Sequence, residues 1–371
     1  MILRIEDLKD VCSKILSAVD SSELSTLTET IELKTVGKSL HLAVTNREYY
    51  VRVKLELEEE INFHATVNAN LFLKLIAQTT TETVEITVDN TTLIVKGNGT
   101  YKLPLIYNGE NLLELPVINI SNPTTDFEIE GDILASILNY NSKEIAKGNI
   151  VRPVQKLYYV DENGAITFTT GACVNNFSLE KPIKVLLNQK VVKLFKLFKN
   201  EKVKFTLGYD KITEELIQTK VKFETDSVCI TAILPSDNTL LASVPVTAIR
   251  NRVTNVYPYS VNVNKDELIQ AINRLLLFVN SKEFTKTFGN FEFNNNSVIL
   301  RDSDNINSET IYYSTPLDNC EYKNSIDLMD LKATLENCVE KYLTISFGDS
   351  QAVVIARGNI YNIIPEVIET N

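Results

Sequence analysis

Two kinds of amphipathic segment alternate along this chain, and the pair recurs three times. In each segment apolar residues follow the i, i+3/i+4, i+7 spacing of an α-helix with one buried face. The acids that open the first kind, Asp7, Asp132 and Asp266, lie 125 and 134 residues apart, each interval close to a third of the 371 residues. A period of this length indicates a repeated structural unit. The first kind spans 7–20, 131–148 and 264–281, and the second spans 68–79, 188–200 and 325–338.

Residues with period-two alternation separate these helices and predict antiparallel hairpins. The clearest are 84–88 with 92–97 around Asp89-Asn90, 342–348 with 351–358, and 165–171 after Asn163-Gly164. We therefore predict an α+β fold of three repeated domains, each with two helices against antiparallel sheets. Pro, Asn and Ser cluster at 119–125 and 255–260, which gives predicted domains 1–122, 123–255 and 256–371.

Composition predicts a cytoplasmic protein. Hydrophobic residues make up 44% of the chain and charged residues 23%, without a run long enough to span a membrane. The N-terminus "MILRIEDLKD" has charges where a signal peptide has its apolar stretch. The five cysteines are scattered and include no C-x-x-C pair, so we expect buried thiols.

The chain shows none of the patterns that catalysis requires. Its only histidines, His41 and His64, lie among strand-like residues, and no phosphate loop, H-E-x-x-H motif or paired metal-ligand spacing is present. We predict a protein that is not an enzyme, with no catalytic residues, metal or cofactor.

The stretch "NQKVVKLFKLFKN" at 188–200 predicts a helix with a purely cationic face. At the α-helical turn angle Val191, Leu194, Phe195 and Phe198 lie on one side, and Lys190, Lys193, Lys196 and Lys199 lie on the other. One interpretation is an ordinary solvated face. The other is a basic lining that contacts phosphates, set within a chain whose net charge is −11.

These features together resemble the bacterial DNA polymerase III β subunit, the sliding clamp. In the first repeat "LHLAVTNREYYVRVKL", "HATVNANLFLKLIAQT" and "VEITVDNTTLIVKGNGTYKLPL" follow the family pattern over about 31–106. In the third, "VNKDELIQAINRLLLFVNS" and "AVVIARGNIYNIIPEV" are similar to the family's opening helix and closing strand. The second repeat departs: "TFTTGACVNNFSL" keeps Thr170 and Gly171 but lacks the family's His-Arg pair, which suits a divergent clamp from a phage or another mobile replicon.

The resemblance implies a ring of two chains, joined head to tail through domain 1 of one and domain 3 of the other, that encircles double-stranded DNA. It also implies that DNA polymerase and clamp loader dock short peptides in an apolar cleft between domains 2 and 3. For that cleft we predict Thr170, Gly171, Val174, Val244, Pro245, Ile363, Ile364 and Pro365. The predicted DNA-binding residues are Lys9, Lys14, Lys74, Lys143, Lys147, Arg152, Lys190, Lys193, Lys196, Lys199, Arg274 and Lys332.

Three alternatives remain open at this level. The chain could be a β-rich structural or carbohydrate-binding protein, a monomeric processivity factor that grips DNA without closing, or a monomer whose sheet edges are blunted. "YNIIPEVIE" could equally be a final strand that only packs on its own sheet.

Overall fold

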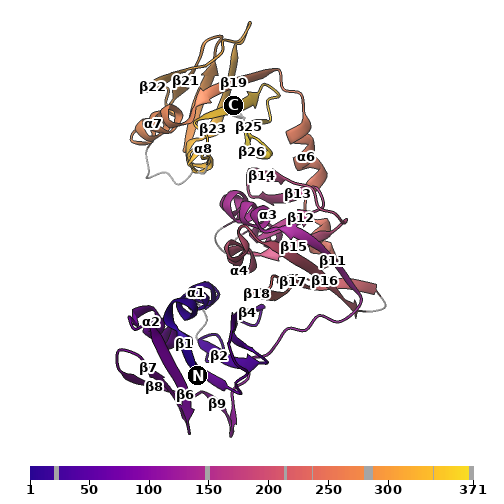
Figure 1. The fold of residues 1–371 in the computed structure, drawn as a ribbon. Helices are drawn as coiled ribbons and strands as arrows, with labels where there is room; N and C mark the ends of the chain where they lie inside the picture. Colours follow the sequence, from indigo (N-terminus) through magenta and orange to yellow (C-terminus); the bar gives the residue numbers. More distant parts are fainter. Residues whose placement is uncertain are drawn as a thin grey trace. The chain divides into compact units, whose positions relative to one another are not determined.

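Antiparallel sheets with helices packed against them make up the fold of the described chain, as the α+β prediction requires (Figure 1). The computed structural model describes residues 1–20, 25–146, 151–212, 215–235, 237–279, 287–336 and 338–366. These residues form two compact units, residues 1–135 with 190–236 and residues 136–189 with 237–371. The predicted domain boundaries near 122 and 255 stay predictions.

The first unit contains two main sheets. The four-stranded sheet has the order β1 (Ile2–Arg4), β6 (Thr83–Asp89), β7 (Thr92–Lys96), β8 (Thr100–Pro104), and a short hairpin joins β9 (Tyr107–Asn108) to β10 (Asn111–Leu112). The eight-stranded sheet has the order β11 (Thr124–Glu130), β16 (Lys202–Ile212), β17 (Glu215–Glu224), β18 (Val228–Ile233), β4 (Tyr49–Glu56), β3 (Ser39–Thr45), β2 (Thr30–Val36), β5 (His64–Asn68). Residues of β18 pair with β4 from Val228↔Val53 to Ala232↔Tyr49, so one sheet continues across two of the predicted repeats.

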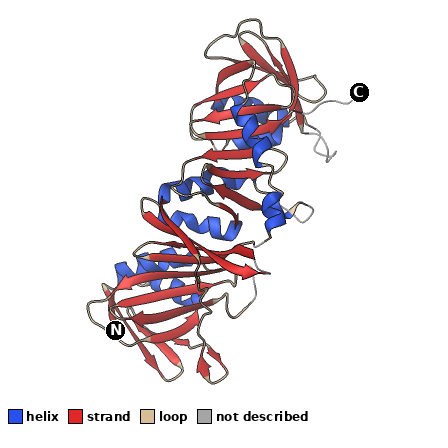
Figure 2. Cartoon of the chain, turned by 90° about the vertical axis from the view of Figure 1, so that its right-hand side faces the viewer, coloured by secondary structure: helices blue, strands red, loops and turns tan. Residues whose placement is uncertain are grey.

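The second unit has the same plan. Its eight-stranded sheet has the order β15 (Lys184–Asn188), β12 (Leu157–Asp161), β13 (Gly164–Phe168), β14 (Ala172–Asn176), β26 (Ile360–Pro365), β25 (Ala352–Arg357), β24 (Tyr342–Phe347), β19 (Tyr259–Asn264). Its four-stranded sheet has the order β22 (Ser308–Tyr312), β21 (Ser297–Arg301), β20 (Phe288–Phe293), β23 (Tyr322–Asp327). Figure 2 shows the strands of each unit with the helices beside them. Here the sheet is continued by the β14–β26 ladder, from Ala172↔Ile363 to Asn175↔Ile360.

The predicted helices form where apolar periodicity coincides with a capping residue. The side chain of Asn68 accepts a hydrogen bond from the N–H of Leu71 and caps α2 (Ala69–Gln78), and Asp327 likewise caps α8 (Leu328–Leu335). Two further predicted helices form as regular α-helices, α1 (Ile5–Leu16) and α7 (Lys265–Leu276). The N-terminal end predicted for α8 was wrong, because residues up to Asp327 belong to β23. Leu16 belongs to the apolar pattern predicted at 7–20 and was expected on the buried face, but its side chain is exposed at the end of α1.

Both helices predicted in the middle repeat are irregular. The segment predicted at 131–148 is α3 (Gly131–Ser136), then a π-helical turn (Ile137–Asn141) and a 3₁₀ turn (Ser142–Glu144); residues 147 and 148 lie outside the described residues. The segment predicted at 188–200 is α4 (Gln189–Val192) followed by a 3₁₀ helix (Lys193–Phe198). A further 3₁₀ turn (Pro153–Lys156) precedes β12, and the sequence analysis missed α5 (Asn238–Ala242) and α6 (Val246–Thr254).

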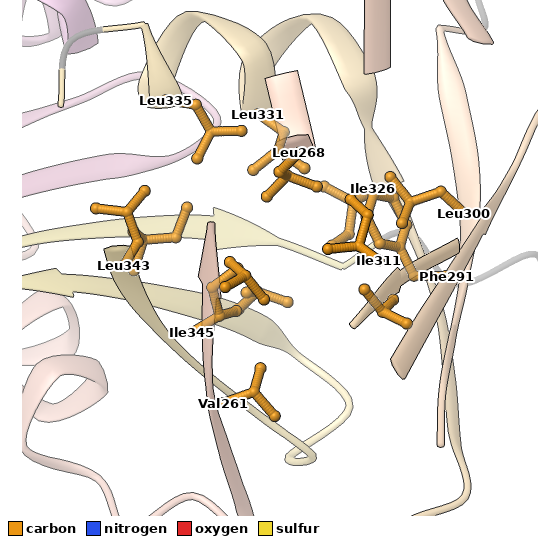
Figure 3. Packing of buried hydrophobic residues seen from close by; sticks show 14 of the residues in the cluster. Val261, Leu268, Phe291, Leu300, Ile311, Ile326, Leu331, Leu335, Leu343 and Ile345 are labelled. Carbon is orange, nitrogen blue, oxygen red and sulfur yellow. The ribbon is translucent and has the colours of Figure 1, made fainter. Parts of the chain in front are cut away.

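In one hydrophobic core of the second unit, side chains of the helices pack against side chains of both sheets. Leu268 of α7 and Leu331 and Leu335 of α8 meet Phe291 of β20 and Leu343 of β24 (Figure 3). Full burial of such a side chain contributes about 1.5–3 kcal/mol. All five cysteines are buried and unpaired, as expected. None of the helices in the described ranges is long and apolar enough to cross a membrane.

Candidate nucleic-acid surface and peptide cleft

The basic segment at 188–200 is anchored by its apolar side, as predicted. Val191, Leu194, Phe195 and Phe198 are buried. The Phe195 ring lies edge-on to Phe223 of β17, with ring centroids 4.9 Å apart, and Phe223 in turn contacts Phe205 of β16. This aromatic cluster fixes the segment on the first unit's sheet, so its opposite side must face away from the core.

Three lysines form a row on that opposite side. Lys193, Lys196 and Lys199 are exposed, and the first two belong to the 3₁₀ helix. A 3₁₀ helix has three residues per turn, so side chains three apart lie directly above one another, about 6 Å apart along the axis. The predicted α-helix would instead have fanned them out by about 60° per step. We call Lys193, Lys196 and Lys199 the lysine row.

Lys190 does not belong to this row. Its ammonium group lies 3.0 Å from a carboxylate oxygen of Asp20 and 3.9 Å from one of Glu48. Asp20 also accepts a hydrogen bond from Asn46. Lys190 therefore holds the start of α4 to the segments that follow α1 and β3.

The predicted basic residues of α1 and α2 differ in their surroundings. Lys14 forms an ion pair of 2.9 Å with Asp10 one turn earlier on α1. Lys9 is half-buried, and the exposed side of α1 also carries Glu6 and Asp7. Lys74 is exposed on α2. Of these two helices, α2 is the less acidic surface.

In the second unit, two of the predicted residues already have acidic partners. Arg274 on α7 donates two hydrogen bonds to Glu309, at 2.6 and 2.9 Å, and this pairing lowers the pKa of Glu309. Lys332 lies 3.7 Å from Glu336 on α8. Lys143 and Arg152 are exposed, and Lys147 lies outside the described residues.

An apolar cluster brings together three of the residues predicted for the peptide cleft. Val174 of β14, Val244 before α6 and Ile363 of β26 all lie in it. The cluster covers one face of the β14–β26 ladder, and we call it the seam cluster. Its buried members are Val154, Tyr159, Ile166, Ala172, Val174, Leu186, Val244, Ile249, Ala352, Val354 and Ile363.

The remaining predicted cleft residues are distributed around it. Ile364 faces the opposite side and belongs to the core of Figure 3, because neighbouring residues of a strand point to opposite faces. Thr170 is exposed and donates a hydrogen bond of 3.2 Å to Asp330 on α8. Gly171 abuts the carbonyl oxygen of Ile363, which leaves no room for a Cβ atom. Pro245 is exposed at the start of α6, and Pro365 pairs with Ala352.

The sequence analysis did not predict the two helices that cover one side of the seam cluster, α5 and α6. Leu240 and Leu241 of α5, and Val246 and Val253 of α6, pack against it while staying partly exposed. A cavity of about 510 Å³ opens between these helices and the ends of β12 and β15. Asp237 as a helix cap and apolar residues at 246, 249 and 253 were signals that could have revealed both helices.

The titratable groups near the cleft do not form a reactive cluster. Burial raises the pKa of the Cys173 thiol to about 12, so this thiol stays protonated. Glu144 accepts a hydrogen bond from Thr169, but burial, and then the charge of Asp330, raise the pKa of its carboxyl. Within the described ranges, no three His, Cys, Asp or Glu side chains gather as metal ligands.

Comparison with known proteins places this architecture. No protein-family model matches the sequence, and no curated protein matches it either. Solved structures match over almost the whole chain. The sliding clamp (DNA polymerase III subunit beta) from Pseudomonas aeruginosa bound to griselimycin has a TM-score of 0.80, with 13% identity and 99% of both chains covered.

Two further structures agree. The DNA polymerase sliding clamp from Bacillus subtilis has a TM-score of 0.78 at 16% identity, covering 99% of this chain and 98% of that one. The Helicobacter pylori beta clamp bound to DNA ligase peptide has a TM-score of 0.76 at 14% identity, with 99% of both chains covered. The chain therefore has the fold of the bacterial DNA polymerase III β subunit, the sliding clamp.

Proposed function

We propose that this protein is a DNA sliding clamp, a tether that keeps a DNA polymerase on duplex DNA and performs no chemistry itself. The observation that carries the proposal is the match of 99% of the chain to bacterial clamps at TM-scores up to 0.80. A partial match could reflect a shared sheet motif, but a match of this extent covers every helix and sheet described above.

The lysine row supports binding that is independent of base sequence. A protein that slides must contact phosphates, because contacts to base edges would hold it at one register. Lysines are point charges on flexible stems and can pass from one phosphate to the next. In our proposal Lys193, Lys196 and Lys199 make such contacts, with Lys74, Lys143 and Arg152 as further exposed candidates. The overall charge of −11 opposes binding of DNA elsewhere on the surface.

Two chains would close the ring through sheet edges. The strands β8 and β22 each end a four-stranded sheet, one in each unit. An unpaired edge strand offers backbone groups to a neighbouring chain. Exposed apolar side chains lie on β22 itself, with Tyr312 at 70% exposure, and at the end of α7, with Leu277 at 79% and Phe278 at 59%. We infer that β8 of one chain pairs with β22 of the next.

This pairing predicts a solution mass of about twice the 41.8 kDa of one chain. Analytical ultracentrifugation measures that mass directly. Thr310→Pro removes a backbone N–H from the β22 edge and should give monomers. Thr100→Pro should do the same at β8. A wild-type monomer, or a dimer that survives both substitutions, contradicts the pairing.

The seam cluster would receive the partner peptides. The Helicobacter pylori clamp binds a DNA ligase peptide, and the Pseudomonas aeruginosa clamp binds griselimycin. In this chain the partly exposed Leu240, Leu241, Val246 and Val253 surround a buried apolar floor, which is the environment that a short apolar peptide requires. The absence of the His-Arg pair predicts a peptide preference different from that of the family.

The decisive experiment compares retention on circular and linear DNA. The protein is loaded on nicked circular duplex, the complex is isolated by gel filtration, and half of the sample is linearised. A closed ring stays on circles and slides off the linear ends. Blocking both ends with a bound protein should restore retention. Equal retention on free linear and circular DNA would remove the topological claim.

A second experiment tests the cleft. Griselimycin binding is measured by calorimetry for the wild type and for Val246→Asp, which places a charge beside the apolar floor. Asn251→Asp, on the exposed side of α6 and outside the lining of the cavity, is the control. We expect binding to be lost only in Val246→Asp, and binding that is insensitive to both substitutions would exclude this surface.

A further inference from the structure

The helix α6 crosses the ladder that continues the second unit's sheet. It contacts β14 on one side of the ladder and β25 and β26 on the other. The ladder between β14 and β26 is short, from Ala172↔Ile363 to Asn175↔Ile360. Val246, Ile249 and Val253 of α6 pack into the seam cluster above it. The helix α6 therefore contacts both sides of the seam cluster.

An ion pair ties α6 to the β14 side. The Arg250 guanidinium lies 2.6 Å from a carboxylate oxygen of Asp161 at the end of β12. The Asp161 side chain is only 3% exposed, and it also accepts hydrogen bonds from the Asn163 N–H and the Tyr159 hydroxyl. Because these hydrogen bonds hold Asp161 in place at its strand end, the ion pair positions Arg250, and with it α6, relative to β12.

A second ion pair ties α6 to the β26 side. Arg252 lies 2.7 Å from Asp349, in the turn between β24 and β25, and the Asp349 side chain is 14% exposed. The backbone N–H groups of Gln351 and Ala352 donate to the other carboxylate oxygen of Asp349. This carboxylate too is fixed by its own turn, independently of α6.

We propose that α6 is a brace across the β14–β26 ladder, and that Arg250 and Arg252 are positioning residues for the peptide site. Each arginine meets a carboxylate that belongs to a different side of the ladder. Together they fix the orientation of Val246, Ile249 and Val253, and so the width of the apolar site between the two sides. The consequence for peptide binding rests on the function proposed above, whereas the brace itself does not.

The physical reason lies in the burial of the two acids. A buried carboxylate that loses its cation is left with an uncompensated charge, and the structure responds by admitting water or by moving the partner element. Here the element free to move is α6, because strand and turn already hold Asp161 and Asp349. Loss of either arginine should thus loosen α6 from one side and leave the other side attached.

The test uses the full chain with Arg250→Met, Arg252→Met and the matched control Arg274→Met. Arg274 also makes an arginine–carboxylate pair, with Glu309, but this pair is more exposed and lies away from the ladder. Hydrogen exchange of the amides of Val174, Tyr361 and Ile363, which point across the ladder, reports on the ladder. Griselimycin affinity reports on the site. In each of the first two variants we expect the ladder amides to exchange about tenfold faster and griselimycin to bind about tenfold more weakly. Both quantities should stay unchanged in the control.

A double variant separates positioning from a general loss of stability. Asp349→Asn alone, and Arg252→Met with Asp349→Asn together, complete a cycle for the second pair. If the pair acts as a unit, the double variant has no uncompensated charge and recovers affinity relative to Arg252→Met. Ladder exchange that is the same in Arg250→Met, Arg252→Met and wild type overturns the brace. A wild type that does not bind griselimycin counts against the cleft, while ladder exchange still decides on the brace.

Discussion

Neutralising the lysine row should change how DNA binding depends on salt. The triple variant Lys193→Gln, Lys196→Gln, Lys199→Gln removes three exposed charges and leaves the buried side of the segment intact. Each phosphate that a lysine no longer neutralises lowers the slope of log affinity against log salt by about 0.9, so three such phosphates lower it by about 2.7. Between 50 and 200 mM salt the affinity of the wild type should then fall about 40-fold more than that of the variant.

The assay is fluorescence anisotropy of a labelled duplex, titrated at several salt concentrations in that range. The matched control is Lys204→Gln, Lys220→Gln, Lys222→Gln, which changes the net charge equally. Those lysines lie 3.4, 3.3 and 2.7 Å from Asp126, Asp210 and Glu224, so their charge is already compensated. Circular dichroism checks the fold. An unchanged slope in the lysine-row variant, or an equal decrease in the control, would refute the reasoning.

Three further outcomes follow from the packing. Lys190→Met should lower the unfolding free energy by about 1 kcal/mol in urea titrations with little effect on the salt slope, because Lys190 pairs with Asp20; a lowered slope would contradict this. Phe195→Ala should cost about 3–5 kcal/mol, measured the same way, since its ring is fully buried against Phe223; a decrease below about 1 kcal/mol would count against that packing. The pKa of Glu144 is raised above its ordinary 4.5, so the folded state holds this proton more tightly than the unfolded state, and stability falls as the pH rises from that value. In thermal unfolding scans at several pH values, Glu144→Gln should flatten this fall. An unchanged pH profile would show the linkage to be wrong.

The resemblance to sliding clamps can be recognised from the sequence because its hairpin and helix patterns are local and recur along the chain. The hairpins at 84–88 with 92–97 and at 342–348 with 351–358 form as predicted, as β6–β7 and β24–β25. Such hairpins are encoded locally, by turn residues between alternating strands. The apolar faces of α1, α2 and α7 were likewise readable, since helical periodicity records which side is buried.

The helices of the middle repeat were predicted less well from the sequence, because they are irregular. The segment after Gly131 has helical periodicity, yet a π-helical turn ends the α-helix at Ser136. Gly131 itself lies against the carbonyl oxygen of Phe198, a close approach that only a glycine permits. Contacts of this kind between distant segments leave no periodic trace in the sequence.

The residues of the candidate site also fall into two groups, those that the sequence predicts and those that only the folded structure reveals. The exposure of Lys193, Lys196 and Lys199 and the burial of Phe195 could be predicted from the amino-acid order alone, because both follow from the face of one local segment. The pairing of Lys190 with Asp20, the place of Ile363 rather than Ile364 in the seam cluster, and the cover that α6 provides emerged only from the folded chain. Periodicity indicates which side of an element is buried, but the partner that covers that side comes from another part of the chain and depends on the whole packing.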